Sequence, residues 1–407
     1  MVPLKILFVV PNVPSFIRPR PFNFIRRLSR DHDVSVLCVA TNESDYRFAS
    51  ELRPYCQSLE IVRLPRWRSL WNCLGALFSD TSLRCAYFYS PRLRDRVSSK
   101  VAGREVDVVH AEHLKSMPMV EHIAGKVPTV FDAVDCISVF EARRRRLLQN
   151  PFLRSFSRME WGRMTRGEAK ASGLFNRIVI SSTVDKESYP APSHLRHKVD
   201  MVPNGIDLEH FEFHKYQPET NLIVFCAKLD YFPNQDAAVY FVQSVWPVLL
   251  ARRPQLRLEI VGSRPPRSVR RLDGKNNIQV IPSVPDVRPH LGRAWVAISP
   301  IRAQAGTQNK VLEAMALGVP VVATQMCCSG LAVEAGKHLL VADTPEEFAS
   351  AVEYLLDDQL LRANIVRAAR AYVERHHDCA ECVKGLCQVY EEAVSDFARQ
   401  VESVERH

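Results

Sequence analysis

The sequence predicts an α/β protein made of two doubly wound domains, each with a parallel sheet covered by helices on both faces. Short runs rich in Val and Ile recur throughout the 407 residues, and the segments between them are long enough for helices. Strands that are apolar throughout are typical of a sheet buried on both sides, because each crossover helix returns the chain across a sheet face.

The predicted strands form two series, separated by a polar, proline-containing segment at 208–220. The first series is Lys5–Val10, Val34–Ala40, Leu59–Leu64, Val106–His110, Thr129–Phe131, Arg177–Ser181 and Val199–Val202. The second series is Asn221–Ala227, Leu256–Val261, Ile278–Ile281, Trp295–Ser299, Pro320–Ala323 and Leu339–Val341. We therefore expect a first domain over residues 1–203 and a second over 204–378.

Apolar residues at helical spacing predict the main helices of the second half. They are expected at Asp236–Arg252, Asn309–Leu317 and Glu346–Leu356, and then as continuous helix from residue 358 to the end. The last part, 379–407, would be poorly buried alone, so we expect it to pack back on the first domain. Two such domains facing each other would form a cleft at the carboxyl ends of their sheets, where α/β proteins bind ligands.

Composition narrows the class of protein. With 46% hydrophobic and 24% charged residues, the chain is typical of a globular enzyme or binding protein rather than a fibrous or disordered one. The apolar run Ile6–Val10 is too short for a signal peptide and is ended by Pro11. No run approaches the ~20 apolar residues that cross a bilayer, so we expect a cytoplasmic protein, held peripherally if it meets the inner face of a membrane.

The eleven cysteines are an odd number scattered through apolar contexts, which predicts reduced thiols rather than disulfides. The motif Cys379-Ala380-Glu381-Cys382, preceded by His376 and His377, has the spacing of half a zinc site. No matching half-site lies nearby in the sequence. We therefore interpret the motif as a helical face and expect no metal site.

The net charge of +9 is concentrated in one stretch. Residues 141–170 contain nine Lys and Arg against three acids, interspersed with Leu, Phe and Trp. Such a segment can bind anionic lipid headgroups, and a solvated basic helix face is an equally good interpretation. Net charge alone would also suit nucleic acid, but the sequence contains no recognisable nucleic-acid-binding module.

The stretch 306–324 has the pattern of a loop, a helix that starts near Thr307 and ends at Gly318, and a strand. The free amides and positive dipole end of such a helix suit a diphosphate. Glu313 lies about two turns into the helix, where its carboxylate can accept hydrogen bonds from a ribose diol. The donors at the start of this helix come from Gly306, Thr307, Gln308, Asn309 and Lys310.

This stretch, together with Val202-Pro203-Asn204-Gly205-Ile206-Asp207, resembles the signature of glycosyltransferase family 4. The resemblance continues through Ala227–Asp236, Ile260–Gly262, Val284–Pro289 and Ala297–Pro300, which look like a branch associated with bacterial exopolysaccharide loci. It covers nearly the whole second domain and, more weakly, the first. The resemblance implies the GT-B fold, in which two Rossmann-like domains face each other across a cleft.

The resemblance also implies a retaining transferase for polysaccharide biosynthesis. The second domain would bind a UDP- or GDP-linked sugar, and the first would present a glycan or lipid-linked acceptor. By position, Glu313 would hold the ribose, Lys228 would contact the diphosphate, and Gly262 and Val284 would line the nucleotide site. No cofactor is expected beside the donor substrate.

Two positions depart from the family pattern. Family members commonly carry an acid eight positions before the ribose-binding Glu, where this chain has Ala305, and a lysine five positions after the diphosphate contact, where it has Pro233. We expect Lys310, Arg302 or the amides of 306–308 to replace these contacts, because each lies in the same loop and offers hydrogen-bond donors.

In the first domain, Asp107–His113 resembles the family's strand that ends in closely spaced histidines near the donor sugar. The usual second histidine is replaced by Glu112. His110, Glu112 and His113 are therefore candidates to hold sugar hydroxyls or to polarise the donor. Each alone is equally well interpreted as a structural residue at a strand end.

Further candidates lie on the acceptor side. Asp132 and Asp135 follow the strand at 129–131 and either orient an acceptor hydroxyl or cap the next helix. The loop at 11–21 lacks the paired glycines usual in the family and carries Arg18 and Arg20 among four prolines. A stiff cationic loop of this kind suits a phosphate-bearing acceptor.

Two other functions share this set of motifs. A non-catalytic, nucleotide-sugar-binding scaffold subunit is motivated by Ala305 and the altered diphosphate contacts. A GT-B epimerase that acts on a nucleotide sugar would use the same cleft without an acceptor. A nicotinamide dehydrogenase is disfavoured, because no Gly-x-Gly-x-x-Gly follows the first strand.

Overall fold

The computed structural model describes residues 3–303 and 307–405. The chain divides into two units, each with its own parallel sheet. Unit 1 comprises the chain up to Gly205 together with the part from Cys379 onward, and unit 2 comprises Ile206–Asp378. Within the described ranges, no helix is long and apolar enough to cross a membrane.

Unit 1 contains a sheet in the order β3-β2-β1-β4-β5-β6-β7, with every pair parallel. Its strands are β1 (Lys5–Val10), β2 (Asp33–Ala40), β3 (Ser58–Arg63), β4 (Val108–Glu112), β5 (Thr129–Val134), β6 (Arg177–Ile180) and β7 (Val199–Met201). Its α-helices are α1 (Pro19–Leu28), α2 (Ala49–Leu52), α3 (Arg66–Ala76), α4 (Leu83–Phe88), α5 (Pro91–Ala102), α6 (His113–Val120), α7 (Ile137–Leu147), α8 (Pro151–Leu174), α9 (Thr183–Ser188) and α18 (Cys379–Glu405). Short 3₁₀ turns lie at Glu43–Phe48, Arg53–Tyr55, Glu121–Ile123 and Ser193–Lys198.

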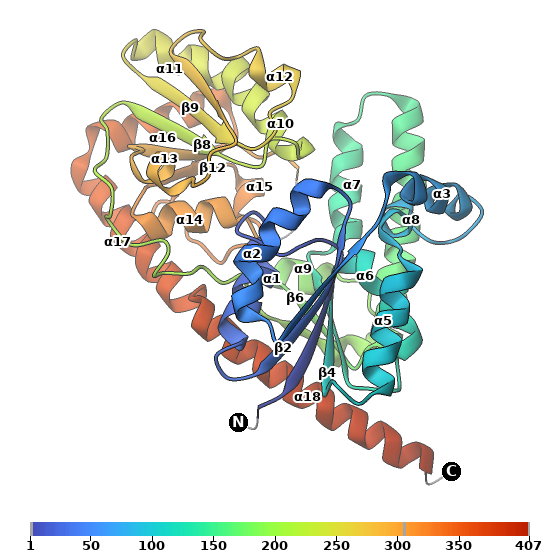
Figure 1. Cartoon of the computed structure of the whole chain (residues 1–407). Coiled ribbons are helices and arrows are strands. Elements are labelled where there is room, and N and C mark those ends of the chain that lie inside the picture. Colours follow the sequence, from blue (N-terminus) through green and yellow to red (C-terminus); the bar gives the residue numbers. More distant parts are fainter. Residues whose placement is uncertain (1–2, 304–306, 406–407) are drawn as a thin grey trace. The chain divides into compact units, whose positions relative to one another are not determined.

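The two faces of this sheet are covered by different helices (Figure 1). Leu7 and Val9 of β1 point into a core shared with α5, α6 and α8. The alternate residues Ile6 and Phe8 point into a second core, built with α1 and α18. This period of two places consecutive apolar residues on opposite faces, which is why the strands of a doubly covered sheet are apolar throughout.

Unit 2 contains a parallel sheet in the order β10-β9-β8-β11-β12-β13. Its strands are β8 (Leu222–Cys226), β9 (Arg257–Gly262), β10 (Ile278–Pro282), β11 (Val296–Ser299), β12 (Val321–Ala323) and β13 (Leu340–Val341). Its α-helices are α10 (Phe232–Tyr240), α11 (Trp246–Arg252), α12 (Arg267–Arg270), α13 (Arg288–Gly292), α14 (Asn309–Leu317), α15 (Gln325–Cys328), α16 (Pro345–Asp357) and α17 (Gln359–His376), and a π-helical turn at Phe241–Val245 joins α10 to α11.

Local sequence explains several helix boundaries. In α16, Thr344 caps the first turn and receives a reciprocal contact from Glu347, while Pro345 occupies the first helical position. Helix α8 starts in the same way, with Asn150 as its cap and Pro151 in its first turn. Helix α14 ends at Gly318, whose φ of 82° is the left-handed conformation that glycine adopts without strain.

The predicted fold class is confirmed, since both sheets are parallel and each predicted strand is present, with bounds within two residues except at the end of β5, which runs three residues further. Two details differ from the expectation. The helix expected from residue 358 to the end is interrupted at His377 and Asp378, between α17 and α18. The helix expected from Asp236 starts at Phe232, because Pro233 is favoured in a first helical turn.

Candidate functional site

Both sheets reverse their strand order next to the first strand of the unit, between β1 and β4 in unit 1 and between β8 and β11 in unit 2. Loops that leave the carboxyl ends of such a strand pair diverge to opposite faces of the sheet. The crevice between them is where doubly wound domains bind ligands. Each unit therefore has one expected binding edge, and most of the predicted site residues lie there.

In unit 2 this edge is formed by the residues after β8 and by the segment from β11 to α14. Helix α14 spans Asn309–Leu317, the range predicted for it, with Gln308 as the cap residue just after the predicted start near Thr307. Thr307 is buried, and its hydroxyl donates to the Gly330 carbonyl at 3.4 Å. The predicted contact at Gly306, and the departure at Ala305, lie outside the described residues.

Glu313 occupies the middle of α14 with a half-buried side chain. Burial raises the pKa of its carboxyl to about 7, although the Lys310 ammonium opposes the shift. Lys310 donates to the Gln308 side chain at 2.5 Å, and burial lowers the pKa of its ammonium. At pH 7 the Glu313 carboxyl is therefore partly neutral and partly charged. The Lys310 ammonium is bound by a side chain at the start of the same helix.

Lys228 is the second residue after β8 and is half-exposed. Its ammonium lies 3.9 Å from Asp230, and its backbone carbonyl accepts from Asn234 at 2.8 Å. The second contact fixes the turn into α10, so the backbone under the Lys228 side chain is well anchored.

The other predicted nucleotide contacts flank this edge. Gly262 ends β9 at a close approach of two backbones, because a Cβ built there would lie 1.8 Å from the Ala227 carbonyl oxygen. A side chain at this position would therefore push apart the ends of β8 and β9. Val284 follows β10 and packs, partly buried, against the core of unit 2.

Arg302 was expected to help bind the diphosphate, and the structure gives its guanidinium another partner. Both Nε and Nη2 donate to Asp236, at 3.0 and 2.6 Å, and the guanidinium stacks over Tyr240 at 4.4 Å. A bidentate pair of this kind fixes the arginine on α10. A diphosphate contact by Arg302 would compete with Asp236.

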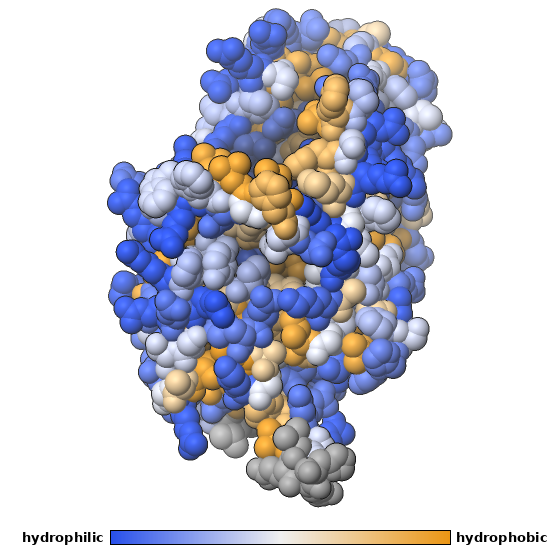
Figure 2. Space-filling model, turned by 90° about the vertical axis from the view of Figure 1, so that its right-hand side faces the viewer, coloured by the Kyte–Doolittle hydropathy of each residue, from blue (hydrophilic) through white to orange (hydrophobic). Residues whose placement is uncertain are grey.

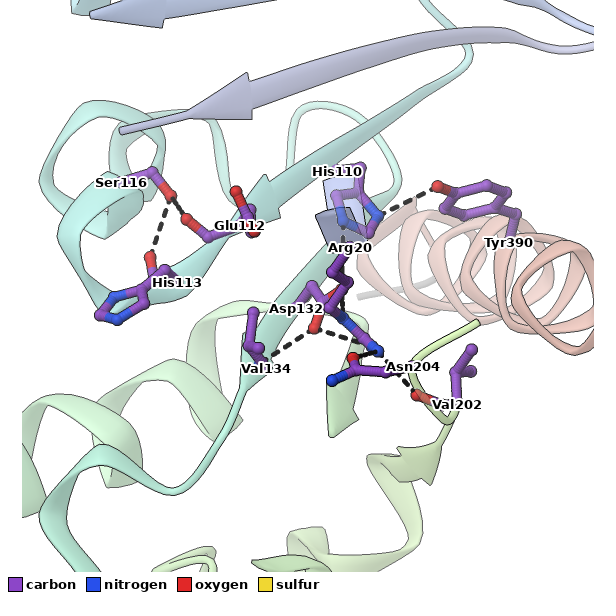
Figure 3. A network of polar contacts seen from close by, with 10 residues as sticks. All are labelled: Arg20, His110, Glu112, His113, Ser116, Asp132, Val134, Val202, Asn204 and Tyr390. Atoms are coloured by element: carbon purple, nitrogen blue, oxygen red, sulfur yellow. Dashed lines mark hydrogen bonds and ion pairs between the residues drawn. The ribbon is translucent and has the colours of Figure 1, made fainter. Parts of the chain in front are cut away.

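In unit 1, Arg20 and Asp132 form a buried ion pair at the carboxyl end of β5 (Figure 3). Arg20 Nε and Nη2 donate to the two carboxylate oxygens at 2.8 and 3.2 Å, and Nη1 donates to Val202 and Asn204 at 3.0 and 2.7 Å. Burial favours neutral Asp132, but Arg20 and His110 outweigh it and lower the pKa to about 2. Arg20 lies in the first turn of α1, and the expected contact with an acceptor phosphate would compete with these partners.

His110 belongs to the same network. Its Nδ1 lies 3.0 Å from the Tyr390 hydroxyl and its Nε2 lies 3.6 Å from Asp132 (Figure 3). Its ring also stacks on Phe8. Both ring nitrogens thus face protein groups, and the side chain is buried. His110 is therefore held in β4 by protein partners, and its candidacy for contact with a sugar stays a prediction.

Glu112 and His113 lie where β4 turns into α6, at the binding edge of unit 1. Burial, reinforced by the Asp132 carboxylate, raises the pKa of Glu112 to about 8. Burial and the Lys115 ammonium hold the pKa of His113 well below its usual range. The backbone of His113 has a φ of 65°, a strained conformation for a residue with a side chain, and such strain clusters at functional sites.

Ser116 stabilises the turn from β4 to α6, because its hydroxyl contacts the carbonyls of Glu112 and His113 (Figure 3).

The other two predicted acceptor-side residues also have protein partners. Arg18 donates to the Val13 carbonyl at 3.0 Å and lies 3.8 Å from Asp45, so it stabilises the loop after β1. Asp135 accepts from the Ser181 hydroxyl at 3.2 Å. Burial and the nearby Asp185 raise the pKa of Asp135 to about 8.

Two features of this edge were not expected from the sequence. Tyr390 of α18 reaches His110 across 280 residues of sequence. A cavity of about 290 Å³ opens at the carboxyl ends of β2 and β3. It is lined by Ala40, Thr41, Asn42, Glu43, Tyr46, Arg63, Leu64, Pro65, Arg66 and Trp67. The clustering of Arg63, Arg66 and Trp67 in the sequence was the available signal for this cavity.

The two cysteines of the possible half zinc site, Cys379 and Cys382, lie on α18. Cys379 and Cys382 are buried in the core that α18 shares with α1. In the part of the chain that the structure describes, no group of three or more His, Cys, Asp or Glu is arranged to hold a metal ion.

Asp132→Asn should lower the free energy of unfolding by about 3–5 kcal/mol at pH 7, because it leaves the Arg20 cation buried without its partner. The folded pKa of about 2 lies below the reference value of 3.8. This contribution is therefore present above pH 4 and lost as the pH falls toward 2, so the difference from wild type should narrow over that range. Urea unfolding followed by circular dichroism at several pH values measures it.

Asp135→Asn is the matched control. Since the pKa of Asp135 is raised to about 8, its carboxyl is mostly neutral at pH 7, and an amide should replace it at a cost of about 1 kcal/mol or less. An equal decrease in the free energy of unfolding of the two variants at pH 7 would contradict the assignment of Asp132 as the charged partner of Arg20.

Comparisons with known proteins agree with this geometry. Residues 220–358 match the family described as glycosyl transferases group 1. Among solved structures, HepE of Anabaena in complex with UDP-glucose aligns with a TM-score of 0.68 at 15% identity, over 96% of this chain and 100% of that one. A glycosyltransferase from Rickettsia africae aligns with a TM-score of 0.68 at 14% identity, over 97% and 99%.

Sucrose-phosphate synthase of Thermosynechococcus elongatus aligns with a TM-score of 0.69 at 14% identity, over 96% of this chain and 99% of that one. No curated protein sequence matches the chain. At these identities the structural matches show the fold, and the family match covers most of unit 2. The chain therefore has the fold of the GT-B glycosyltransferases, and its residues 220–358 match the group 1 glycosyltransferase family.

Proposed function

We propose that the protein is a retaining glycosyltransferase that moves a sugar from a UDP- or GDP-linked donor to a glycan or lipid-linked acceptor in polysaccharide biosynthesis. The observation that carries the proposal is the position of α14. Its N-terminus and Glu313 lie at the binding edge of a domain that matches the group 1 family. HepE, which has the same fold, has been crystallised with UDP and with UDP-glucose.

In the proposed site, unit 2 holds the donor. The amides at the start of α14 face the diphosphate, as at other helix N-termini that bind phosphate. Charged Glu313 accepts hydrogen bonds from the ribose hydroxyls, and Lys228 places its ammonium beside the diphosphate. As the sugar leaves, negative charge grows on the β-phosphate, and a fixed cation stabilises that charge.

Unit 1 supplies the groups for the sugar and the acceptor. With a pKa of about 8, Glu112 is mostly protonated at pH 7 and can donate a hydrogen bond to a sugar hydroxyl. Neutral His113, with its lowered pKa, can accept a hydrogen bond from one. Asp132 stays ionised, and its role is to hold Arg20 and the chain at Val202–Asn204 in place.

We further propose that the acceptor enters at the cavity between the ends of β2 and β3, where Arg63 and Arg66 offer cations to a phosphate-bearing acceptor. A lipid-linked acceptor also requires contact with a membrane, and the basic stretch at 143–166 is proposed to provide it on anionic bilayers. Release of the protein from anionic vesicles by salt tests this contact, because salt screens the attraction over about 10 Å at 0.1 M.

Glu313→Gln should weaken binding of the donor nucleotide at pH 8 by about 1–3 kcal/mol, because the carboxylate accepts stronger hydrogen bonds than an amide. The pKa of Glu313 is about 7, so wild type should lose this advantage as the pH falls below 7. Titration calorimetry at pH 6, 7 and 8 measures the difference. Changes in the charge of the nucleotide are common to both proteins, so parallel pH profiles would show that Glu313 lies outside the site.

Lys228→Ala should reduce turnover by about tenfold or more, with little effect on melting temperature, because it removes a cation that opposes charge on the leaving diphosphate. Lys215→Ala is the control, since Lys215 is similarly exposed in unit 2 and pairs with Glu212. The assay follows release of nucleoside diphosphate from the donor, with and without acceptor. Donor binding without any turnover by wild type would instead favour the non-catalytic scaffold subunit.

A further inference from the structure

Helix α3 has its apolar side chains on the outside. Trp67 and Trp71 are 61% and 67% exposed, and Leu70 and Leu74 beside them are also exposed. Their spacing of three and four residues places all of these side chains on one face of the helix. Phe78, just beyond the end of the helix, is 94% exposed.

The inner face of α3 is small and polar. Ser69 and Ala76 are its buried residues. The Asn72 amide donates to the Tyr89 carbonyl at 2.9 Å, and the Cys73 thiol donates to the Leu83 carbonyl at 3.5 Å. A surface helix normally buries its apolar stripe and exposes its polar face. Helix α3 does the opposite, so its apolar face does not serve the core of unit 1.

The first half of helix α8 repeats this reversal. Ser157, Glu160 and Arg163 are buried on the inner side of α8. The Glu141 carboxylate of α7 is also buried and accepts from the Ser157 hydroxyl at 2.6 Å. The large apolar residues of α8 that face outward are Phe152, Leu153, Phe156, Met159 and Trp161.

The segment after α3 joins these elements into one surface. Arg163 of α8 donates to the Leu77 carbonyl at 3.1 Å, and Glu160 accepts from the Ser82 hydroxyl at 2.8 Å. Figure 2 shows apolar side chains gathered in clusters among hydrophilic ones on the face that it views. We define the outer apolar surface by its exposed members, which are Trp67, Leu70, Trp71, Leu74, Leu77, Phe78, Phe152, Leu153, Phe156, Met159 and Trp161.

The two segments that carry most of the outer apolar surface are rich in arginine. Acids lie only next to them, where exposed Asp80 pairs with Arg166 and exposed Glu43 lies 4.0 Å from Arg63. Residues 61–79 and 142–159 contain no Asp, Glu or Lys. Together they contain nine arginines, and their summed charge of +9 equals the net charge of the whole chain. Those of the first segment are Arg63, Arg66 and Arg68, and those of the second are Arg143, Arg144, Arg145, Arg146, Arg154 and Arg158.

We propose that the outer apolar surface inserts into the headgroup region of an anionic bilayer, with α3 as its main anchor. Exposed apolar patches of this kind mark interaction sites, and Trp is favoured at the membrane–water interface. The arginines can bury their alkyl stems beside the aromatic rings while their charges meet lipid phosphates. A second copy of the chain fits poorly, because it would bring nine further arginines against these nine.

This inference extends the proposed function, since an inserted α3 places a membrane next to the cavity that contains Arg66 and Trp67. The role in presenting a lipid-linked acceptor rests on the proposed transfer reaction. The insertion itself does not, because vesicle binding is measured without donor or acceptor. The experiment on membrane insertion can therefore fail or succeed independently of the proposed transfer reaction.

The test uses the full chain and vesicles of phosphatidylcholine with or without phosphatidylglycerol. The variant Trp67→Ser, Trp71→Ser, Phe78→Ser should bind anionic vesicles about tenfold more weakly or worse, because burial of aromatic area is lost. The matched control is Tyr354→Ser, Leu360→Ser in unit 2, whose side chains are 62% and 70% exposed and which should bind as wild type does. A third variant, Arg146→Gln, Arg154→Gln, Arg158→Gln, should bind more weakly and lose most of its salt dependence.

Arg144 and Arg145 are left unchanged, because Arg144 pairs with buried Glu141 and Arg145 stacks on Trp161. Brominated lipids should quench the tryptophan fluorescence of the wild type, and Trp67→Phe, Trp71→Phe should remove most of that quenching while retaining binding. Wild-type affinity in the triple Ser variant, or an equal loss in the unit 2 control, would overturn the proposal. So would sedimentation of the free protein as a dimer that the triple Ser variant converts to monomer.

Discussion

The ion pair between Arg20 and Asp132 ties together segments that are distant in sequence. Arg20 comes from α1, Asp132 from the end of β5, and the same guanidinium holds the carbonyl of Val202 and the side chain of Asn204. Asn23, one turn further along α1, donates to the Gly205 carbonyl at 3.1 Å, and Cys379 packs so closely on Gly205 that a Cβ there would lie 2.7 Å from the Cys379 Cα. Unit 1 thus anchors both points where the chain leaves it and returns. A charged pair that is buried and fully hydrogen-bonded holds such a junction, because breaking it would leave a buried charge.

The same pair sets the ionisation of the neighbouring acids. Asp132 stays charged because Arg20 and His110 outweigh the effect of burial, with a pKa of about 2. Glu112, on the next strand, feels that negative charge in addition to burial, and its pKa rises to about 8. Two carboxyl groups on adjacent strands therefore have opposite protonation at pH 7. Such divergence is a common way to place a hydrogen-bond donor beside a fixed anion.

The sequence predicted the strands well because burial on both faces leaves a local mark, namely runs such as Ile6–Val10 that are apolar at every position. It predicted the limits of α14 because Gly318 is a local stop signal. The partners of a side chain cannot be predicted from local sequence in this way, because they can be distant along the chain. His110 meets Tyr390 from 280 residues away, and Arg20 meets Asp132 from 112 residues away, so both looked available for ligands.

Helix α3 shows a second limit of prediction from the sequence. The spacing of Trp67, Leu70, Trp71 and Leu74 indicates one apolar helical face, and spacing alone cannot say whether that face points into the core or out of it. The direction is set by the polar contacts of Asn72 and Cys73 on the other side. The roles proposed for Glu112, His113, Lys228 and Glu313 remain predictions, since geometry places them at the binding edges of their units without a ligand.

The most direct measurement is the melting temperature of the purified chain in the presence of UDP, GDP or NAD. A ligand that binds only the folded state raises the melting temperature by mass action. Because α14 is proposed to bind a diphosphate and a ribose, and no Gly-x-Gly-x-x-Gly loop follows the first strand, UDP or GDP should raise the melting temperature and NAD should leave it unchanged. A shift with NAD as large as with either diphosphate, or no shift with UDP and GDP, would contradict a nucleotide-sugar site in unit 2.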